Sequence, residues 1–441
     1  MDFKVKLLSV TGDPQLIVTA GALGCFEEGA SSEILERLLS LSAEERDKKI
    51  KAVIKNSFGM GHGSVGDQCC FIFSIEDLPR IATLQLCLPE FAAHLQQSLR
   101  RAKPERGFHL PDAMKWSDRA KAVMEKSFKF YEDAVKAGVP GEDARYPLPL
   151  YTRTNIQTAI NARELSHIWA MSKKSGTPSI VKTVVGEMIR LAKEVAPYLF
   201  EDFGGNYEQL AWYPSSQLFA ETNETMENLI FRHEKESVAF LGGGITWDGD
   251  LIAEALQRAI RDRDEAALAI LKHVHFEFLA PMSLACFHQA TRQRTWNQSV
   301  ESIYRAAHFA GLGRKMFVPE SIDTASSSIA RRYVDLHWSM VHAYESLLLD
   351  GVPAEEAIGV LPHSLLVYDL IHVNGWNAIH SIGKRRCEKA QREVRRIAKC
   401  MAKHIERVAP VFRGFVEPQC VNYGRCPEKD SCGYGDRMKK K

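Results

Sequence analysis

The chain repeats its own sequence at an offset of 213 residues, and this repeat constrains the fold more than any other feature. The recurring segments are Gly138-Val139-Pro140 with Gly351-Val352-Pro353, Leu148-Pro149 with Leu361-Pro362, Asn161 with Asn374, and Val195-Ala196-Pro197 with Val408-Ala409-Pro410. A period this long indicates a duplicated domain, because solenoid repeats span only about 20–45 residues. The 441 residues therefore predict one domain written twice.

Both copies show the same order of local patterns. Short β-rich runs at residues 69–75 and 275–279 predict strands, as do the runs at 5–10 and 237–241. A helix is expected next in each copy, one through Leu84 to Leu99 with Ser98 and Arg100 at its end, the other over 283–307. Two more helices are expected after each Gly-Val-Pro turn, the last ending at Val-Ala-Pro. Strands mixed with runs of helices indicate an α+β fold.

The repeat also sets the expected domain boundaries. We predict a first domain over residues 1–215, a polar linker over 216–236, a second domain over 237–415, and a cysteine-containing tail over 416–441.

The charges almost cancel, since 57 basic residues face 55 acidic ones. This balance argues against a nucleic-acid partner, which usually requires a basic surplus. No apolar run reaches the roughly 18 residues of a membrane helix, and the first residues have no secretory signal. We expect a cytoplasmic protein with no membrane partner. A few local arginines are still enough to bind a phosphate.

The two copies have kept different arginines. The densest polar feature of the second copy, expected on a helix, is Gln289-Ala290-Thr291-Arg292-Gln293-Arg294, and the aligned first-copy positions include Leu88 and Glu90. The first copy instead keeps Arg100 and Arg145, whose counterparts are Tyr304 and Ile358, whereas Arg385 has the counterpart Ser172. One composite site that uses both copies explains this complementary loss. The alternative for the arginine-rich stretch is a solvated helix face.

These residues resemble the signature of the flavin-dependent thymidylate synthases, an Arg-His-Arg triplet followed after seven residues by a serine. Arg292-Gln293-Arg294 and Ser302 match it, with Gln293 in place of the histidine. The segments Gly61-His62-Gly63-Ser64-Val65-Gly66-Asp67 and Asn161-Ala162-Arg163-Glu164-Leu165-Ser166-His167 resemble two further motifs of the family. The resemblance covers residues 3–200 and 237–412, and it implies two domains of the family's fold that form a pseudo-dimer.

The resemblance also implies the roles of individual residues, because each active site of that family is shared between subunits. Arg385 is then the catalytic residue, placed against the pyrimidine. The implied substrate-binding residues are Gln289, Arg292, Arg385, Ser98, Arg100 and Arg145, and the implied cofactor-binding residues are Arg292, Gln293, Arg294, His62, Ser64, Asn374 and His380. The mirror-image site has lost its arginines and is expected to be inactive.

The implied activity is the FAD-dependent reductive methylation of dUMP to dTMP, with methylenetetrahydrofolate and NADPH as co-substrates. The family's assembly implies a homodimer of pseudo-dimers. Two alternatives stay open. The first is a related reaction, either hydroxymethylation or methylation of a different pyrimidine nucleotide. The second is a non-catalytic nucleotide-binding relic, which is suggested by departures from the family pattern at Gln293, Val300 and Trp376.

The tail contains three evenly spaced cysteines, Cys420, Cys426 and Cys432, with Pro and Gly turns between them. Three such cysteines can wrap a zinc ion or an iron–sulfur cluster, although a lone trio more often carries no metal. A fourth ligand is missing locally, and Cys400, Cys387 or His404 is a candidate. We therefore predict a metal site in the tail.

Overall fold

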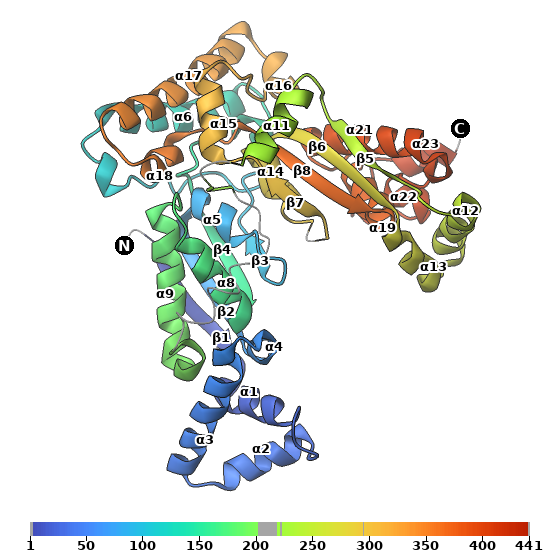
Figure 1. Ribbon diagram of the computed structural model, residues 1–441. Coiled ribbons are helices and arrows are strands. Elements are labelled where there is room, and N and C mark those ends of the chain that lie inside the picture. The colour runs from blue at the N-terminus through green and yellow to red at the C-terminus, as the bar shows by residue number, and fades with distance from the viewer. Residues whose placement is uncertain (1–2, 202–217, 221–222, 294, 440–441) are drawn as a thin grey trace. The chain divides into compact units, whose positions relative to one another are not determined.

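The computed structural model describes residues 3–201, 218–220, 223–293 and 295–439 (Figure 1). Two compact units divide the chain. Unit 1 comprises Met1–Glu132, Leu148–Ser215 and Ser339–Pro362, and unit 2 comprises Asp133–Pro147, Ser216–Trp338 and His363–Lys441. Among the described helices, none is both long enough and apolar enough to cross a membrane.

Unit 1 is built on an antiparallel sheet with the strand order β1-β2-β4-β3. Its strands are β1 (Lys4–Val10), β2 (Cys70–Pro79), β3 (Ala93–Gln96) and β4 (Arg153–Asn161). Alternate residues of β2 point into the core, where Phe71, Phe73 and Ile75 are fully buried. Helix α9 (Ser179–Val195) packs on β1 and β2 with a face of buried aliphatic residues.

Unit 2 repeats this plan with the strand order β5-β6-β8-β7. The strands are β5 (Ala239–Gly244), β6 (His275–Ser283), β7 (Asn297–Val300) and β8 (Leu366–Asn374), and α21 (Arg392–Val408) packs on β5 and β6. The two sheets share one topology, which confirms the α+β fold and the duplication. Helices α9 and α21 end at the Val-Ala-Pro stops, as predicted.

Each unit includes a segment from the other copy, because the long helices α6 (Asp118–Lys136) and α17 (Ser327–Leu349) pass from one unit to the other. First-copy residues 133–147 belong to unit 2, where Ser321 donates to Asp143 at 2.6 Å. Second-copy residues 339–362 belong to unit 1, where the Tyr151 hydroxyl donates to the Glu356 carbonyl at 2.6 Å. The copies have thus exchanged their Gly-Val-Pro segments.

The helix predicted through Leu84 to Leu99 is wrong. Helix α5 (Arg80–Leu86) ends before Pro89, which cannot continue a helix, and β3 then pairs with β4 through His94 and Thr158. The helix predicted over 283–307 is likewise divided into α14 (Leu284–Ala290), β7 and α15 (Ile303–Gly311). Strands β4 and β8, which precede the last helices of each copy, were also missed.

The range predicted as the linker includes a helix, α11 (Glu224–His233). The Asn223 side chain caps it by accepting from the Met226 amide at 3.1 Å. Met226 and Ile230 are buried against Leu279 and Tyr368 of unit 2. These contacts explain why residues 224–233 fold with the second copy, and residues 216–217 lie outside the described residues.

The remaining elements are short or lie at the periphery of the units. Unit 1 contains α1 (Pro14–Leu23), α2 (Ser31–Ser40), α3 (Ala43–Asn56), η1 (Phe58–Met60), α4 (Gly63–Gly66), η2 (Asp112–Met114), α8 (Ala162–Ser172), η3 (Pro197–Phe200), α18 (Ala354–Ala357) and η6 (Ile358–Val360). Unit 2 contains α7 (Gly141–Ala144), α12 (Gly249–Gln257), η4 (Arg258–Asp262), α13 (Glu265–Ile270), η5 (Leu271–His273), α16 (Glu320–Asp323), α19 (Gly375–Asn377), η7 (Ala378–Ile382), α20 (Gly383–Arg385), η8 (Pro410–Phe412), α22 (Gln419–Asn422) and α23 (Tyr434–Lys439).

Candidate functional site

Helix α14 positions Gln289 in unit 2. Ser283 caps the helix, because its hydroxyl accepts from the Cys286 amide at 3.0 Å, and residues 284–288 of the helix are buried. At the other end, the Nε2 atom of Gln289 is buried and has no hydrogen-bond partner among the described residues. A buried donor without a partner costs about 1–3 kcal/mol, so an oxygen atom of a ligand would stabilise this position.

Arg292 and Gln293 lie in the turn that follows α14, and not on a helix as expected. The amides of Arg292 and Gln293 donate to the carbonyls of Gln289 and Ala290, which closes the turn. The Gln293 amide lies against the Arg385 guanidinium, and with its oxygen oriented toward Arg385 it accepts from Nη2 at 2.5 Å and from Nε at 3.1 Å. Two predicted site residues are thus in contact, and Arg294 lies outside the described residues.

A partly buried hydrogen-bond network, which we call the Asn377 clamp, holds this turn against the segment that leads to Arg385. It consists of Thr295, Trp296, Asn377 and Ser381. Thr295 Oγ1 donates to Asn377 Oδ1 at 2.7 Å, and Asn377 Nδ2 donates to the Thr295 carbonyl at 2.9 Å. Trp296 Nε1 donates to Ser381 Oγ at 2.7 Å. Sequence reasoning missed the clamp because its two halves are far apart in the chain.

Asn374 and His380, both predicted to contact the cofactor, lie on the same segment of unit 2. The Asn374 side chain caps α19 by accepting from the Asn377 amide at 2.9 Å. The His380 ring stacks on Trp376, with ring centroids 4.8 Å apart. Burial and the charge of Lys384 lower the pKa of His380, which favours a neutral ring at neutral pH.

Arg145 is the first-copy residue that the exchanged segment brings into unit 2. It is buried, and its guanidinium donates to the Glu142 carbonyl at 3.1 Å and to Gln391 Oε1 at 3.2 Å. Gln391 in turn donates to the Tyr146 hydroxyl. Arg145 is thereby attached to the start of α21 in the second copy.

The same chain of hydrogen bonds continues to α14. The Tyr146 hydroxyl donates to Glu393 Oε2 at 2.8 Å, and Glu393 also accepts from the amide of Ser283 at 2.7 Å and from its hydroxyl at 2.6 Å. Burial raises the pKa of Glu393. We call Arg145, Gln391, Tyr146, Glu393 and Ser283 the Glu393 network. It connects a first-copy arginine to α14, the helix that carries Gln289.

Four predicted residues belong to unit 1. The exposed Ser98 lies in a turn after β3, where its hydroxyl accepts from the Arg100 amide at 3.2 Å. His62 and Ser64 are exposed at the start of α4. The loop that contains them is held to the second motif of the resemblance, because Arg163 pairs with Asp67 at 2.6 Å. The two motifs therefore lie against each other.

The counterparts of the arginines have ordinary structural roles. Ser172 is buried and donates to the Trp169 carbonyl at 2.7 Å, and Ile358 is fully buried. Neither side chain supplies a positive charge.

The tail does not form the predicted metal site. Within the described part of the chain, no group of three or more His, Cys, Asp or Glu side chains is placed to hold a metal ion. Burial, together with Cys426, Cys387 and Cys432, raises the pKa of the Cys420 thiol. These thiols therefore lie close enough to influence one another, but the described structure does not group them as metal ligands.

Comparison with known proteins adds to this geometry. The family described as thymidylate synthase complementing protein matches the chain twice, over residues 6–198 and 218–411. The flavin-dependent thymidylate synthase of Geobacter sulfurreducens is 33% identical over 208 residues, which are 46% of this chain and 87% of the relative. The chain belongs to the flavin-dependent thymidylate synthase family.

Another flavin-dependent thymidylate synthase, from Sulfurisphaera tokodaii, is 35% identical over 208 residues, 46% of this chain and 78% of its own length. The solved structure of the UMP/dUMP methylase PolB from Streptomyces cacaoi, bound with 5-Br dUMP, is similar over 46% of this chain and 94% of its own, with 18% identity and a TM-score of 0.40. The family model matches the chain twice, so this chain contains the flavin-dependent thymidylate synthase domain in tandem.

Proposed function

We propose that this chain catalyses the FAD-dependent reductive methylation of dUMP to dTMP with methylenetetrahydrofolate, at one composite site that uses residues of both copies. The observation that supports a composite site most directly is the placement of Arg145. This first-copy arginine is part of the unit that contains Gln289, Gln293 and Arg385 of the second copy. Family membership supports the reaction itself.

The proposed substrate residues fit the chemistry of a nucleotide monophosphate. Its phosphate carries about two negative charges, which arginines bind through directional, charge-assisted hydrogen bonds. We assign this role to Arg145, with Arg100 and Ser98 completing the phosphate site. The orphaned Gln289 Nε2 donor is available for an oxygen of the nucleotide.

Arg385 has the proposed catalytic role. A guanidinium against the pyrimidine imide favours the ionised ring and raises the electron density at carbon five, the atom that takes the methylene group. Gln293 and the Asn377 clamp would keep Arg385 in this orientation.

The residues around the triplet fit a bound flavin, since Gln293 supplies a neutral amide in place of the family's histidine and Arg292 supplies a cation. We assign flavin binding to these residues, with His62, Ser64, Asn374 and His380. When bound, reduced FAD supplies the hydride that converts the transferred methylene into a methyl group, and NADPH is the proposed source of the electrons.

Flavin uptake and turnover test the proposal together. The purified chain should take up FAD, lose the yellow absorbance when NADPH and dUMP are added, and release tritium from carbon-five-labelled dUMP. Product mass separates the outcomes, because methylation adds CH₂ and hydroxymethylation adds CH₂O. Protein that binds dUMP but takes up no FAD would instead be a nucleotide-binding relic.

Substitutions in both copies test the composite site. Arg385→Ala and Arg100→Ala should each abolish turnover, although the two residues come from different copies. Glu90→Gln, at the aligned position of the mirror-image site, should leave turnover unchanged. Normal turnover of either arginine variant would contradict one composite site.

A further inference from the structure

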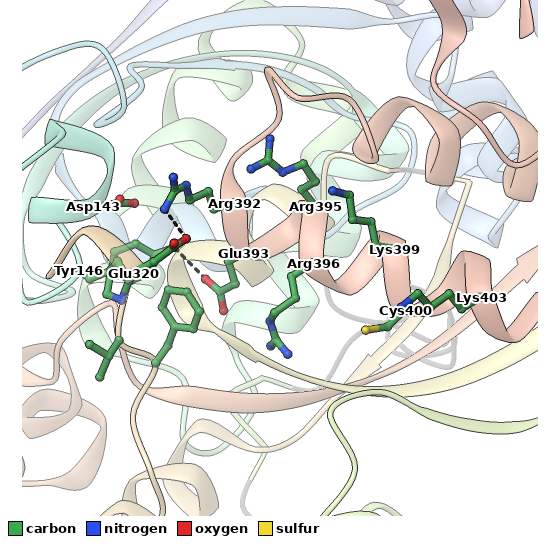
Figure 2. A pocket seen from close by; sticks show the side chains of 13 residues that line it. Asp143, Tyr146, Glu320, Arg392, Glu393, Arg395, Arg396, Lys399, Cys400 and Lys403 are labelled. Atoms are coloured by element: carbon green, nitrogen blue, oxygen red, sulfur yellow. Dashed lines mark hydrogen bonds and ion pairs between the residues drawn. The ribbon is translucent and has the colours of Figure 1, made fainter. Parts of the chain in front are cut away.

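Helix α21 forms one wall of a cleft in unit 2 that the proposed reaction does not use. The cleft has a volume of about 470 Å³, within the range of small-molecule sites. Its opposite wall is the segment 317–320, and Tyr146 and Glu393 also line it, as Figure 2 shows. Tyr146 and Glu393 belong to the Glu393 network, whereas Arg145 is not among the residues that line the cleft.

The wall formed by α21 presents a row of cations. Arg392, Arg396, Lys399 and Lys403 follow one another at steps of four, three and four residues, so they lie on one face of the helix. With a rise of about 1.5 Å per residue, neighbouring charges are about 4.5–6 Å apart along the helix axis. All four side chains are exposed and line the cleft (Figure 2).

Acidic groups neutralise only part of this row. Glu320 pairs with Arg392 at 2.5 Å, and Glu388 pairs with Arg395 at 2.7 Å and with Lys399 at 3.7 Å. Arg396 and Lys403 have no ion-pair partner within 4.0 Å among the described residues.

Two further carboxyl groups line the cleft, Asp143 and Glu393. Their oxygens already accept hydrogen bonds, Asp143 from Ser321 and Glu393 from Ser283 and Tyr146. Burial raises the pKa of both groups, which weakens their negative charge. The charge of Arg396 acts on Glu393 without forming an ion pair, and no ion pair is formed by Lys403 among the described residues, so both cations can still attract an anion from solution.

The first copy provides an internal control, because α9 is the counterpart of α21. Its residues at the positions of Arg392, Arg396 and Lys399 are Ser179, Thr183 and Gly186. The counterpart of Lys403 is Arg190, which two glutamates neutralise, Glu187 at 2.7 Å and Glu194. At the positions of these glutamates, α21 has Cys400 and Arg407. Helix α21 of the second copy therefore has the row of cations and lacks the two acidic residues that neutralise the corresponding cation of α9.

We propose that this cleft binds an elongated small-molecule polyanion, with phosphate or carboxylate groups spaced about 5 Å apart, and that Arg396 and Lys403 are its anchoring residues. The bounded volume and the near-zero net charge of the chain favour a small ligand over a nucleic acid. The site is distinct from the proposed nucleotide site and does not depend on the reaction.

Calorimetric titration of the full chain with inorganic tripolyphosphate, and separately with a triglutamate peptide, tests the proposal. Both titrations are run with dUMP present, so that binding of the probe at Arg145 does not contribute. At least one probe should bind, and Arg396→Gln/Lys403→Gln should weaken it by about tenfold or more, the usual effect of losing a charge-assisted hydrogen bond. Arg190→Gln, the matched change in α9, should bind the probe like the parent chain.

Binding of tripolyphosphate alone identifies a phosphate ligand, and binding of triglutamate alone identifies a carboxylate ligand. The proposal is overturned if neither probe binds, or if the double variant binds as tightly as the parent. A single-stranded oligonucleotide that binds when both probes fail would also overturn it. The control for folding is the thermal unfolding temperature of the double variant, which should equal that of the parent. The titrations do not measure turnover, so an absence of methylation activity would contradict the proposed function without affecting the test of the polyanion site.

Discussion

Replacing Glu393 tests whether the Glu393 network stabilises unit 2. The carboxylate is buried and accepts three hydrogen bonds, at 2.7 Å and 2.6 Å from the amide and hydroxyl of Ser283 and at 2.8 Å from Tyr146. Glu393→Ala leaves three buried donors without an acceptor. The amide of Ser283 cannot turn away, so leaving it without an acceptor costs about 1–3 kcal/mol of stability. The hydroxyls of Ser283 and Tyr146 can rotate toward other acceptors, so each costs about 1 kcal/mol.

The free energy of unfolding should therefore fall by about 3–5 kcal/mol in Glu393→Ala. Glu393→Gln should lose only about 1 kcal/mol, because the amide oxygen still accepts from Ser283. Urea unfolding followed by circular dichroism measures both values. Glu388→Ala is the control, since Glu388 makes only partly exposed ion pairs whose loss costs at most about 1 kcal/mol.

The same substitution has a functional consequence. Because Tyr146 and Gln391 connect Glu393 to Arg145, Glu393→Ala should also raise the dissociation constant of dUMP, whereas Glu393→Gln should leave it near the parent value. An unfolding free energy within about 1 kcal/mol of the parent for Glu393→Ala would refute this reasoning.

Three further substitutions give independent tests. Burial raises the pKa of Asp369 to about 8, so the folded chain keeps a proton that the unfolded chain releases near its ordinary pKa. The free energy of unfolding should therefore fall as pH rises from about 4 to 8. Urea unfolding of Asp369→Asn should show no such decrease between these pH values. Asn377→Ala breaks the Asn377 clamp and should lower the thermal unfolding temperature and kcat, while Asn223→Ala, which removes only a helix cap, should spare kcat. Gly359→Ala would place a Cβ 2.2 Å from the Tyr151 ring and should reduce soluble expression and thermal stability, whereas Gly186→Ala, on open α9 surface, should not.

Local sequence patterns were sufficient to predict several strands and the ends of two helices. Strands β1, β2, β5 and β6 follow β-rich runs, and α9 and α21 end where Val-Ala-Pro stops them. The arrangement of β3 and β4 was not predictable in this way, because pairing of His94 with Thr158 joins residues that are distant in sequence. The apolar spacing through Leu84 to Leu99 is helical, and sheet pairing overrides it.

The sequence by itself determined the duplication, the family, and the division of the arginines between the copies, because all three depend only on residue identities at matched positions. The tertiary structure alone decided that residues 133–147 belong to unit 2. It also decided that Gln293 contacts Arg385, that Glu393 connects Ser283 with Tyr146, and that the cationic face of α21 borders a cleft. These features arise when separate segments pack together, and packing between distant segments leaves no periodic signal in the sequence.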